Sequence, residues 1–306
     1  MSCRVAILGG GIWGAAFGSA IAGSCRPYFW TRNPAKSRRI ARAAGGEWRR
    51  SIAEAAAECD IIIIAASSGG FAEILRAAAS AAKPILWLTK GFAANDRLLC
   101  ETAAEILPSG ACFGALSGPT FAQEVKKRLP AAMVVAANLS AQIPFLQKTL
   151  HQKMLRLYPS DDLTGVCVCG ALKNIIAIAA GISDGMKLGA NARAAIITRG
   201  LSEMAAFNAA LGGRAETMRG VAGVGDLLLT CTSDLSRNRR LGLALGAQKP
   251  IPQATAEGAA AAAGALRRAR NLGLDTPILA AVCGVLQHAL SPPQAAEMLL
   301  SRPPPR

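Results

Sequence analysis

Hydrophobic and polar positions follow two different patterns along the chain, and the pattern changes near residue 159. In the first part, short apolar runs alternate with stretches of helical periodicity. This alternation is typical of a mostly parallel sheet with helical crossovers. It predicts strands over residues 4–8, 28–30, 61–65, 85–88, 111–116 and 132–136, and helices over residues 15–22, 34–40, 71–79 and 98–106.

After residue 159 the strand pattern stops, and long stretches rich in Ala, Ile, Leu and Met repeat every three to four positions. They predict helices over residues 170–182, 192–211, 223–232, 257–272, 278–290 and 293–300. We therefore expect an α/β domain over residues 1–159 and an all-α domain over residues 160–306. The proline-rich end, residues 303–306, is expected to be a disordered tail.

Composition narrows the class of protein. The chain has 306 residues, enough for two domains, and its 52% hydrophobic content excludes a disordered protein. No stretch reaches the roughly 18 uncharged apolar residues of a membrane span. The first ten residues lack a charged region and a small-residue cleavage site, so no signal peptide is expected. These features predict a cytoplasmic protein with no stable membrane insertion.

Cysteine and histidine usage gives no sign of a metal centre. The chain has nine cysteines and two histidines, and the close pair Cys167-x-Cys169 lacks a second pair or a nearby histidine. An odd number of cysteines in a chain of this size favours reduced thiols, most of them in the core. We expect no metal.

The charge balance favours anionic ligands. Lys plus Arg number 34 and Asp plus Glu 19, which gives a formal charge of +15. The cations are spread along the chain, and aromatic residues make up only 5% of it. We therefore expect no nucleic-acid partner, although a nucleotide-binding or nucleic-acid-binding protein without catalysis remains an alternative.

A glycine pattern follows the first predicted strand directly and precedes a helix. The spacing Gly9-x-Gly11-x-x-Gly14 fits the fingerprint of a dinucleotide-binding turn. Gly9 permits the tight turn, Gly11 lets the backbone approach a pyrophosphate, and Gly14 lets the helix pack on the strand. The helix N-terminus then faces the anion. The alternative is a glycine-rich turn that binds nothing.

The end of the second predicted strand bears on the choice of coenzyme. Residues 30–33 contain no Asp or Glu that could bind the ribose hydroxyls of NAD. Arg32 instead suits a 2′-phosphate, through its charge and its forked hydrogen bonding. The sequence therefore favours NADP(H). The alternative is that Arg32 is a solvated cation and that the protein also accepts NAD(H).

Several longer motifs carry a family resemblance. They are residues 89–91 (TKG), 117–124 (SGPTFAQE), 170–185, 189–204 and 223–240, together with the glycine fingerprint. With these motifs the chain resembles, from about residue 4 to about residue 290, the bacterial-type NAD(P)-dependent glycerol-3-phosphate dehydrogenases. The resemblance implies a Rossmann-type doubly wound domain and a helical domain like the C-terminal half of 6-phosphogluconate dehydrogenases. It also implies reversible reduction of dihydroxyacetone phosphate to sn-glycerol 3-phosphate, for glycerophospholipid synthesis.

Reduction of a ketone needs a proton donor for the developing alkoxide. Lys173 lies beside Asn174 in an otherwise apolar predicted helix, a costly place for a charge, although a surface lysine that extends to solvent is the alternative. The resemblance implies that Lys173 is the proton donor and acceptor, and that Lys90 lies beside nicotinamide and substrate. It implies that Asp226 is a carboxylate near Lys173, with Thr230 one turn further along the same helix face. The alternatives are an ordinary loop lysine for Lys90 and a helix N-cap for Asp226.

The substrate phosphate also needs a site. Ser236, Arg237 and Asn238 offer one charged and two neutral donors, and the resemblance implies that they bind the phosphate. The alternative is a solvated run of charges with Arg239 and Arg240. The resemblance further implies substrate contacts from Gly118, Thr120 and Asn174, and cofactor contacts from Ile12, Trp13, Lys90, Ala122, Arg237 and Glu257.

The chain departs from the family pattern around the expected cofactor site, where Ile12 replaces a small polar residue that often contacts the pyrophosphate. The segment between the second strand and Ile61 is short, and residues 66–68 (ASS) replace a Pro-Ser-His/Gln-like turn. A different β-hydroxyacid dehydrogenase or a ketoacid reductase with the same two-domain plan is a competing interpretation. The motif at residues 236–238 favours the phosphorylated substrate. Apolar helix faces favour a homodimer.

Overall fold

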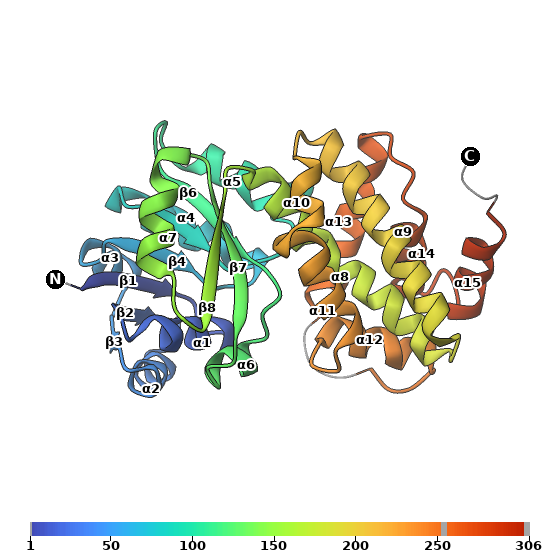
Figure 1. The fold of residues 1–306 in the computed structure, drawn as a ribbon, viewed down its shortest axis with the longest axis horizontal. Coiled ribbons are helices and arrows are strands. Elements are labelled where there is room, and N and C mark those ends of the chain that lie inside the picture. Colours follow the sequence, from blue (N-terminus) through green and yellow to red (C-terminus); the bar gives the residue numbers. More distant parts are fainter. Residues whose placement is uncertain (1, 252–255, 303–306) are drawn as a thin grey trace. The chain divides into compact units, whose positions relative to one another are not determined.

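The computed structural model describes residues 2–251 and 256–302 (Figure 1). The expected tail at residues 303–306 lies outside the described residues. The chain divides into two compact units, Met1–Cys167 and Val168–Arg306. This division lies somewhat later in the chain than residue 159, where the sequence pattern changes.

The described part of unit 1 forms an eight-stranded sheet with the order β3-β2-β1-β4-β5-β6-β7-β8. Its strands are β1 (Cys3–Leu8), β2 (Cys25–Trp30), β3 (Glu47–Trp48), β4 (Ile61–Ile64), β5 (Ile85–Trp87), β6 (Phe113–Ser117), β7 (Ala131–Ala137) and β8 (Leu155–Ser160). Neighbouring strands are parallel except β6 and β7, which are antiparallel. The predicted parallel α/β architecture is confirmed.

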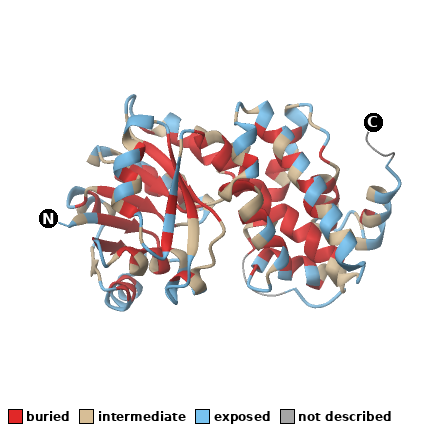
Figure 2. Cartoon of the chain, viewed as in Figure 1, coloured by how far each residue is buried: buried red, intermediate tan, exposed pale blue. Residues whose placement is uncertain are grey.

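Helices cover both faces of this sheet because its strands are apolar on both sides. The helices are α1 (Ile12–Ile21), α2 (Pro34–Ala44), α3 (Ile52–Ala57), α4 (Ser68–Ala78), α5 (Leu99–Ile106), α6 (Ala122–Lys126) and α7 (Ile143–Leu150). One core joins strand residues such as Ile7 and Ile63 to Phe17 of α1, Ile40 of α2 and Leu146 of α7. On β5 the Trp87 ring meets Phe71 of α4, with 5.3 Å between centroids. Figure 2 shows these strands buried.

Five strands and α-helices in the described part of unit 1 have no counterpart among the predicted ones: β3, β8, α3, α6 and α7. In β8, Leu155 and Leu157 are buried whereas Arg156 and Tyr158 are exposed. An edge strand of this kind alternates and tolerates Pro159, so it lacks the continuous apolar run that marks the central strands.

The strand order reverses direction between β1 and β4. From β1 the chain proceeds to β2 and β3 on one side, and from β4 it proceeds to β5 and β6 on the other. In open parallel sheets, ligands bind outside the carboxyl ends of the strands at such a switch point. The glycine pattern lies there, since Gly9 follows β1 and its N–H donates to the Trp30 carbonyl, 2.9 Å away.

The described part of unit 2 is helical. It comprises α8 (Leu163–Gly185), which begins in unit 1, α9 (Gly189–Ala210), α10 (Ala215–Arg219), the π-helical turn η4 (Val221–Gly225), α11 (Asp226–Thr232), α12 (Arg237–Gly246), α13 (Glu257–Asn271), α14 (Pro277–Leu286) and α15 (Pro292–Leu300). The predicted helical second half is confirmed. The sequence pattern did not predict α12, whose first turns carry several charges.

Among the described helices, α8 is the one long and apolar enough to cross a membrane. The sequence did not indicate such a helix, because the periodic pattern starts at residue 170 and Lys173 interrupts the apolar run. Every residue of its apolar window is buried inside the structure. Its apolar composition is that of a core helix.

Candidate active site

The three fingerprint glycines have distinct surroundings. Gly9 has φ +131°, and a Cβ there would collide with the Ala65 carbonyl group, which follows β4. A Cβ at Gly14 would stand 2.8 Å from the Ala65 Cβ. At Gly11 the nearest atom would be 3.7 Å away, so the backbone there is accessible. The turn is therefore tight at Gly9, packed at Gly14 and open at Gly11.

The start of α1 suits a pyrophosphate. Gly11 is its N-cap residue, no side chain caps it, and its first turn holds no acidic residue. The first N–H groups of the helix and its dipole can therefore bind an anion. Ile12 is 72% exposed at this opening, whereas Trp13 is half-buried and packs against the core of unit 1. The glycine turn and α1 thus fit the phosphates of a dinucleotide.

Two cations lie beside the glycine turn. Arg32 is exposed after β2, and Asn33 caps α2 by accepting a hydrogen bond from the Lys36 N–H at 3.1 Å. The Lys36 Cε lies 3.2 Å from the position that a Cβ on Gly10 would take. Lys36 was not among the residues that the sequence pattern singled out. Its signal is a cation in the first turn of the helix that follows the second strand.

The next strands bring further predicted residues to the same edge of the sheet. Lys90 is half-buried after β5, between Thr89, which donates to the Ala66 carbonyl at 2.9 Å, and Gly91 with φ +108°. After β6, the Thr120 hydroxyl donates to the Gly118 carbonyl at 3.2 Å. Ala122 begins α6. These loops follow β4, β5 and β6, so they lie on the carboxyl side of the sheet with the glycine turn.

In unit 2, Lys173 lies in the middle of α8 and is 6% exposed, so the solvent-exposed alternative is wrong. Its ammonium group forms an ion pair with Asp226 and donates to the Thr230 hydroxyl at 3.0 Å. Thr230 in turn donates to the Asp226 carbonyl at 2.6 Å. The structure therefore brings the three predicted residues together from α8 and α11.

The N-cap alternative for Asp226 is also wrong. Gly225 holds the N-cap position of α11, and no side chain caps that helix. Asp226 is 1% exposed, and its carboxylate pairs with Lys173. Two opposite charges that are both desolvated stabilise each other only when they stay together, so each fixes the other's position.

The predicted phosphate residues lie at the start of α12. Ser236 caps this helix by accepting from the Arg239 N–H at 3.2 Å, and Asn238 accepts from the Gly258 N–H at 2.9 Å. The Arg237 side chain is half exposed and lies 3.6 Å from Glu257. Ser236 and Asn238 are buried and in fixed positions, while the Arg237 guanidinium remains accessible.

Asn174 and the arginines that follow Asn238 lie next to these predicted residues. The Asn174 amide donates to Glu257 at 3.4 Å, so the residue after Lys173 contacts the residue that pairs with Arg237. The alternative of a solvated charge run holds for Arg240, which is exposed, and is wrong for Arg239, which is buried and ion-paired. Residues of α8, α11, α12 and α13 therefore converge in unit 2.

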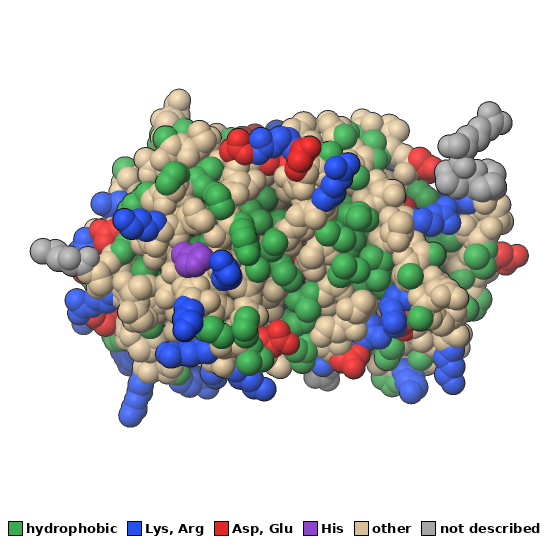
Figure 3. All heavy atoms as spheres, viewed as in Figure 1, with side chains coloured by type: hydrophobic (Ala, Val, Ile, Leu, Met, Phe, Trp, Pro, Cys, Tyr) green, Lys and Arg blue, Asp and Glu red, His purple; other side chains and the backbone are tan. Residues whose placement is uncertain are grey.

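Cys231 follows Thr230 on α11, close enough to Lys173 and Asp226 to interact with their charges. All nine cysteines are free thiols, and burial raises the pKa of Cys231 to about 12. Within the described residues, no group of three or more His, Cys, Asp and Glu side chains could hold a metal ion. On the face drawn in Figure 3, Lys and Arg side chains are most frequent along the lower left edge and are elsewhere interspersed with acidic and apolar ones.

Comparisons with known proteins agree in both halves. Family models described as the N-terminus and the C-terminus of NAD-dependent glycerol-3-phosphate dehydrogenase match residues 47–142 and 162–297. The glycerol-3-phosphate dehydrogenase [NAD(P)+] of Leptothrix cholodnii is 41% identical, over 98% of each chain. That of Methylibium petroleiphilum is 42% identical, over 98% of this chain and 97% of the relative.

Solved structures give the same result. A glycerol-3-phosphate dehydrogenase from Coxiella burnetii superposes with a TM-score of 0.90 at 35% identity, over 98% of this chain and 99% of that one. A ketopantoate reductase from Ralstonia eutropha has a TM-score of 0.55 at 15% identity, covering 97% of this chain and 99% of that one. That second likeness concerns the fold alone.

Proposed function

Since the chain belongs to the NAD(P)-dependent glycerol-3-phosphate dehydrogenase family, which reduces dihydroxyacetone phosphate to glycerol 3-phosphate for phospholipid synthesis, we propose which of its residues perform each task. The activity is that of glycerol-3-phosphate dehydrogenase [NAD(P)+], EC 1.1.1.94. The proposal depends above all on the buried cluster of Lys173, Asp226 and Thr230.

Lys173 gives a proton to the C2 oxygen of dihydroxyacetone phosphate and takes it back in the reverse direction. Bound NAD(P)H supplies the hydride to the carbonyl carbon. Asp226 and Thr230 hold the ammonium group of Lys173, because both accept its N–H groups. A fixed proton donor lowers the barrier only if it meets the oxygen at hydrogen-bond distance, so this restraint is part of the mechanism. Lys90 contacts the nicotinamide and the substrate.

Ser236, Arg237 and Asn238 bind the substrate phosphate. Arg237 suits this task because its pairing with Glu257 is long and half exposed, so a phosphate dianion can replace it. Asn174 lies beside Lys173 and contacts the substrate. Gly118 and Thr120 contribute from the loop after β6.

The cofactor is held by the glycine turn and its neighbours. Gly9, Gly11 and Gly14 shape the pyrophosphate site, with Ile12 and Trp13 along the cofactor. Ala122, Glu257, Arg237 and Lys90 make further contacts. Arg32 and Lys36 together favour NADP(H) over NAD(H), since two cations beside the turn attract a 2′-phosphate. On this view residues 1–159 provide most of the cofactor contacts and residues 160–306 most of the substrate contacts.

The proposal also covers the localisation, the oligomeric state and the partners of the enzyme. The enzyme acts in the cytoplasm as a homodimer, without nucleic-acid or membrane partners. Exposed leucines on the helical unit, including Leu188, Leu228 and Leu243, support association between copies. The cations are spread along the whole sequence and form no long basic run, which favours small anions over a polyanion.

The decisive experiment follows NADPH absorbance with dihydroxyacetone phosphate and repeats it with NADH. Lys173→Ala is compared with wild type and with Lys249→Ala, which removes an exposed lysine of the same unit. We expect Lys173→Ala to lower kcat about 10²–10⁴-fold, the usual contribution of general acid catalysis. Lys249→Ala should leave the rate unchanged. A folded Lys173→Ala variant with wild-type turnover would refute the proton-donor role.

A further inference from the structure

Four glycines bring α12 into backbone contact with α8. On α8 they are Gly181 and Gly185, and on α12 they are Gly242 and Gly246. A Cβ at any of them would collide with backbone atoms of the other helix. Each pair is spaced by four residues and so lies on one helix face. The two helices therefore meet without intervening side chains, and α12 cannot slide along α8 without backbone collisions.

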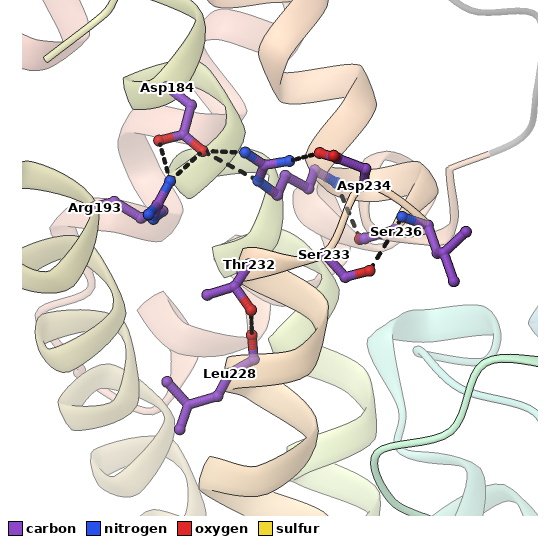
Figure 4. Close-up of polar contacts among 9 residues, drawn as sticks. Asp184, Arg193, Leu228, Thr232, Ser233, Asp234 and Ser236 are labelled. Carbon is purple, nitrogen blue, oxygen red and sulfur yellow. Dashed lines mark hydrogen bonds and ion pairs between the residues drawn. The ribbon is translucent and has the colours of Figure 1, made fainter. Parts of the chain in front are cut away.

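One buried arginine also joins the same pair of helices through an ion pair. Arg239 of α12 donates from Nε and a terminal nitrogen to Asp184 of α8, at 3.1 and 2.6 Å, and from its other terminal nitrogen to Asp234 at 2.5 Å. Its side chain and that of Asp184 are each 10% exposed. Figure 4 shows Asp184 between this guanidinium and Arg193, with Asp234 on the opposite side. All three nitrogens of Arg239 are thus engaged by carboxylates.

Arg239 stands two residues after Arg237 on the same helix. Successive helix positions differ by about 100°, so the two side chains point to nearly opposite faces. Arg239 faces α8, whereas Arg237 remains half exposed. Ser236 accepts from the backbone N–H of Arg239. The same residue, Arg239, therefore takes part in the N-terminal cap of α12 through its backbone and in the ion pair through its side chain.

We propose that Arg239 is a positioning residue: its pairing with Asp184 and Asp234 sets the first turn of α12 on α8, so that Arg237 and Asn238 hold the substrate phosphate at a fixed distance from Lys173. This inference rests on the proposed phosphate role of Arg237. Lys173 and Asp184 lie on the same helix. The ion pair between Arg239 and Asp184 therefore holds the phosphate site in a fixed position relative to the proton donor. Arg239 acts through Arg237 and does not touch the substrate.

The test is a double-mutant cycle on Arg237→Ala and Arg239→Lys. Lysine keeps the charge but loses the two-point contact with Asp184. Removing a charged hydrogen bond to phosphate should raise the KM for dihydroxyacetone phosphate about 10–100-fold in Arg237→Ala. We expect about a 5–10-fold rise in Arg239→Lys, with a smaller rise in the KM for NADPH because Arg237 is also assigned a cofactor contact. In the Arg237→Ala background, Arg239→Lys should add less than about twofold, because its effect passes through Arg237.

Two further variants keep the test informative. Asp234→Ala removes one partner of Arg239 from a site that is 95% exposed, so the fold is retained, and should raise the KM for dihydroxyacetone phosphate about twofold. Arg240→Ala, on the exposed face of α12, is the matched control and should change nothing.

Opposing results would separate the two claims. Independent, multiplicative effects of Arg239→Lys and Arg237→Ala would overturn the positioning role, as would a rise in the KM for NADPH as large as the rise in the KM for dihydroxyacetone phosphate. A wild-type KM in Arg237→Ala would instead overturn the proposed phosphate site.

Discussion

The two units build their candidate sites from different parts of the polypeptide. In unit 1 the features are mainly backbone: a turn at Gly9, an open approach at Gly11 and an uncapped start of α1. In unit 2 they are side chains, with Lys173 and Asp226 paired and almost completely buried. Backbone amides carry partial charges that need no partner before a ligand arrives, whereas buried full charges do. Electrostatic substitutions should therefore affect stability in unit 2 and mainly ligand affinity in unit 1.

The largest effect is expected at the buried ion pair. Asp226→Ala removes the carboxylate that balances the buried Lys173 ammonium, which should lower the free energy of unfolding by about 3–5 kcal/mol. The double variant Lys173→Met, Asp226→Leu should recover most of this stability, because apolar groups of similar volume replace both charges. It should recover no turnover. Chemical denaturation and the NADPH assay measure the two properties, and a double variant as unstable as the single one would contradict this account.

The second effect concerns Glu203, a buried residue of α9 that the sequence analysis did not single out. Its carboxylate accepts from the N–H groups of Ile278 and Leu279 at 2.6 and 3.1 Å, at the start of α14. Burial raises its pKa from 4.5 to about 7, with a smaller contribution from Asp275, against the opposing effect of the two N–H groups. The folded state therefore retains a proton that the unfolded state releases between these values.

The sign of the pH dependence follows. Below pH 4.5 Glu203 is protonated in both the folded and the unfolded state, and its contribution to the free energy of unfolding is fully present. This contribution is lost as pH rises to about 7. The loss is about 3 kcal/mol by the usual conversion of pKa shifts. Urea unfolding of wild type and Glu203→Gln at pH 5 and pH 7.5 should show a steeper decline in wild type. Glu216→Gln, at an exposed position, is the control, and equal slopes in all three proteins would contradict the prediction.

A smaller stability effect but a clear binding effect is expected at the glycine turn of unit 1. Gly9→Ala places a Cβ against the Ala65 carbonyl at positive φ, which should cost about 1–3 kcal/mol and distort the turn. NADPH affinity, measured by fluorescence titration, should fall at least about tenfold. Gly69→Ala, at an open helical position, should leave binding unchanged. Equal affinity in both variants would argue against a cofactor role for the turn.

The smallest effect on stability is expected for the two exposed cations. Arg32→Ala and Lys36→Ala should each change the free energy of unfolding by less than about 0.5 kcal/mol. Each should weaken NADPH binding about tenfold and leave NADH binding unchanged, because the 2′-phosphate alone distinguishes the two coenzymes. Arg39→Ala, an exposed cation further along α2, is the matched control. Equal losses for NADPH and NADH would exclude a role in coenzyme selection.

The sequence by itself determined the α/β order of unit 1, the helical nature of unit 2 and the glycine turn. These features depend on local patterns: continuous apolar runs for central strands, three-to-four periodicity for helices, and glycine where φ is positive. The edge strand β8 and the charged helix α12 were not predicted, because neither carries a strong local pattern. Lys36 was not predicted as a cofactor contact, because a cation in a first helical turn is common.

Only the tertiary structure decided which charged side chains are buried. Lys173 and Asp226 are 53 positions apart, and their pairing depends on how α8 packs against α11. Arg239 and Arg240 are neighbours in sequence, yet one is locked to Asp184 and the other faces solvent. Burial and ion pairing are set by whatever packs opposite a helix face, and that partner comes from a distant part of the chain. Local sequence therefore fixed the backbone features of the site, and long-range packing fixed its charges.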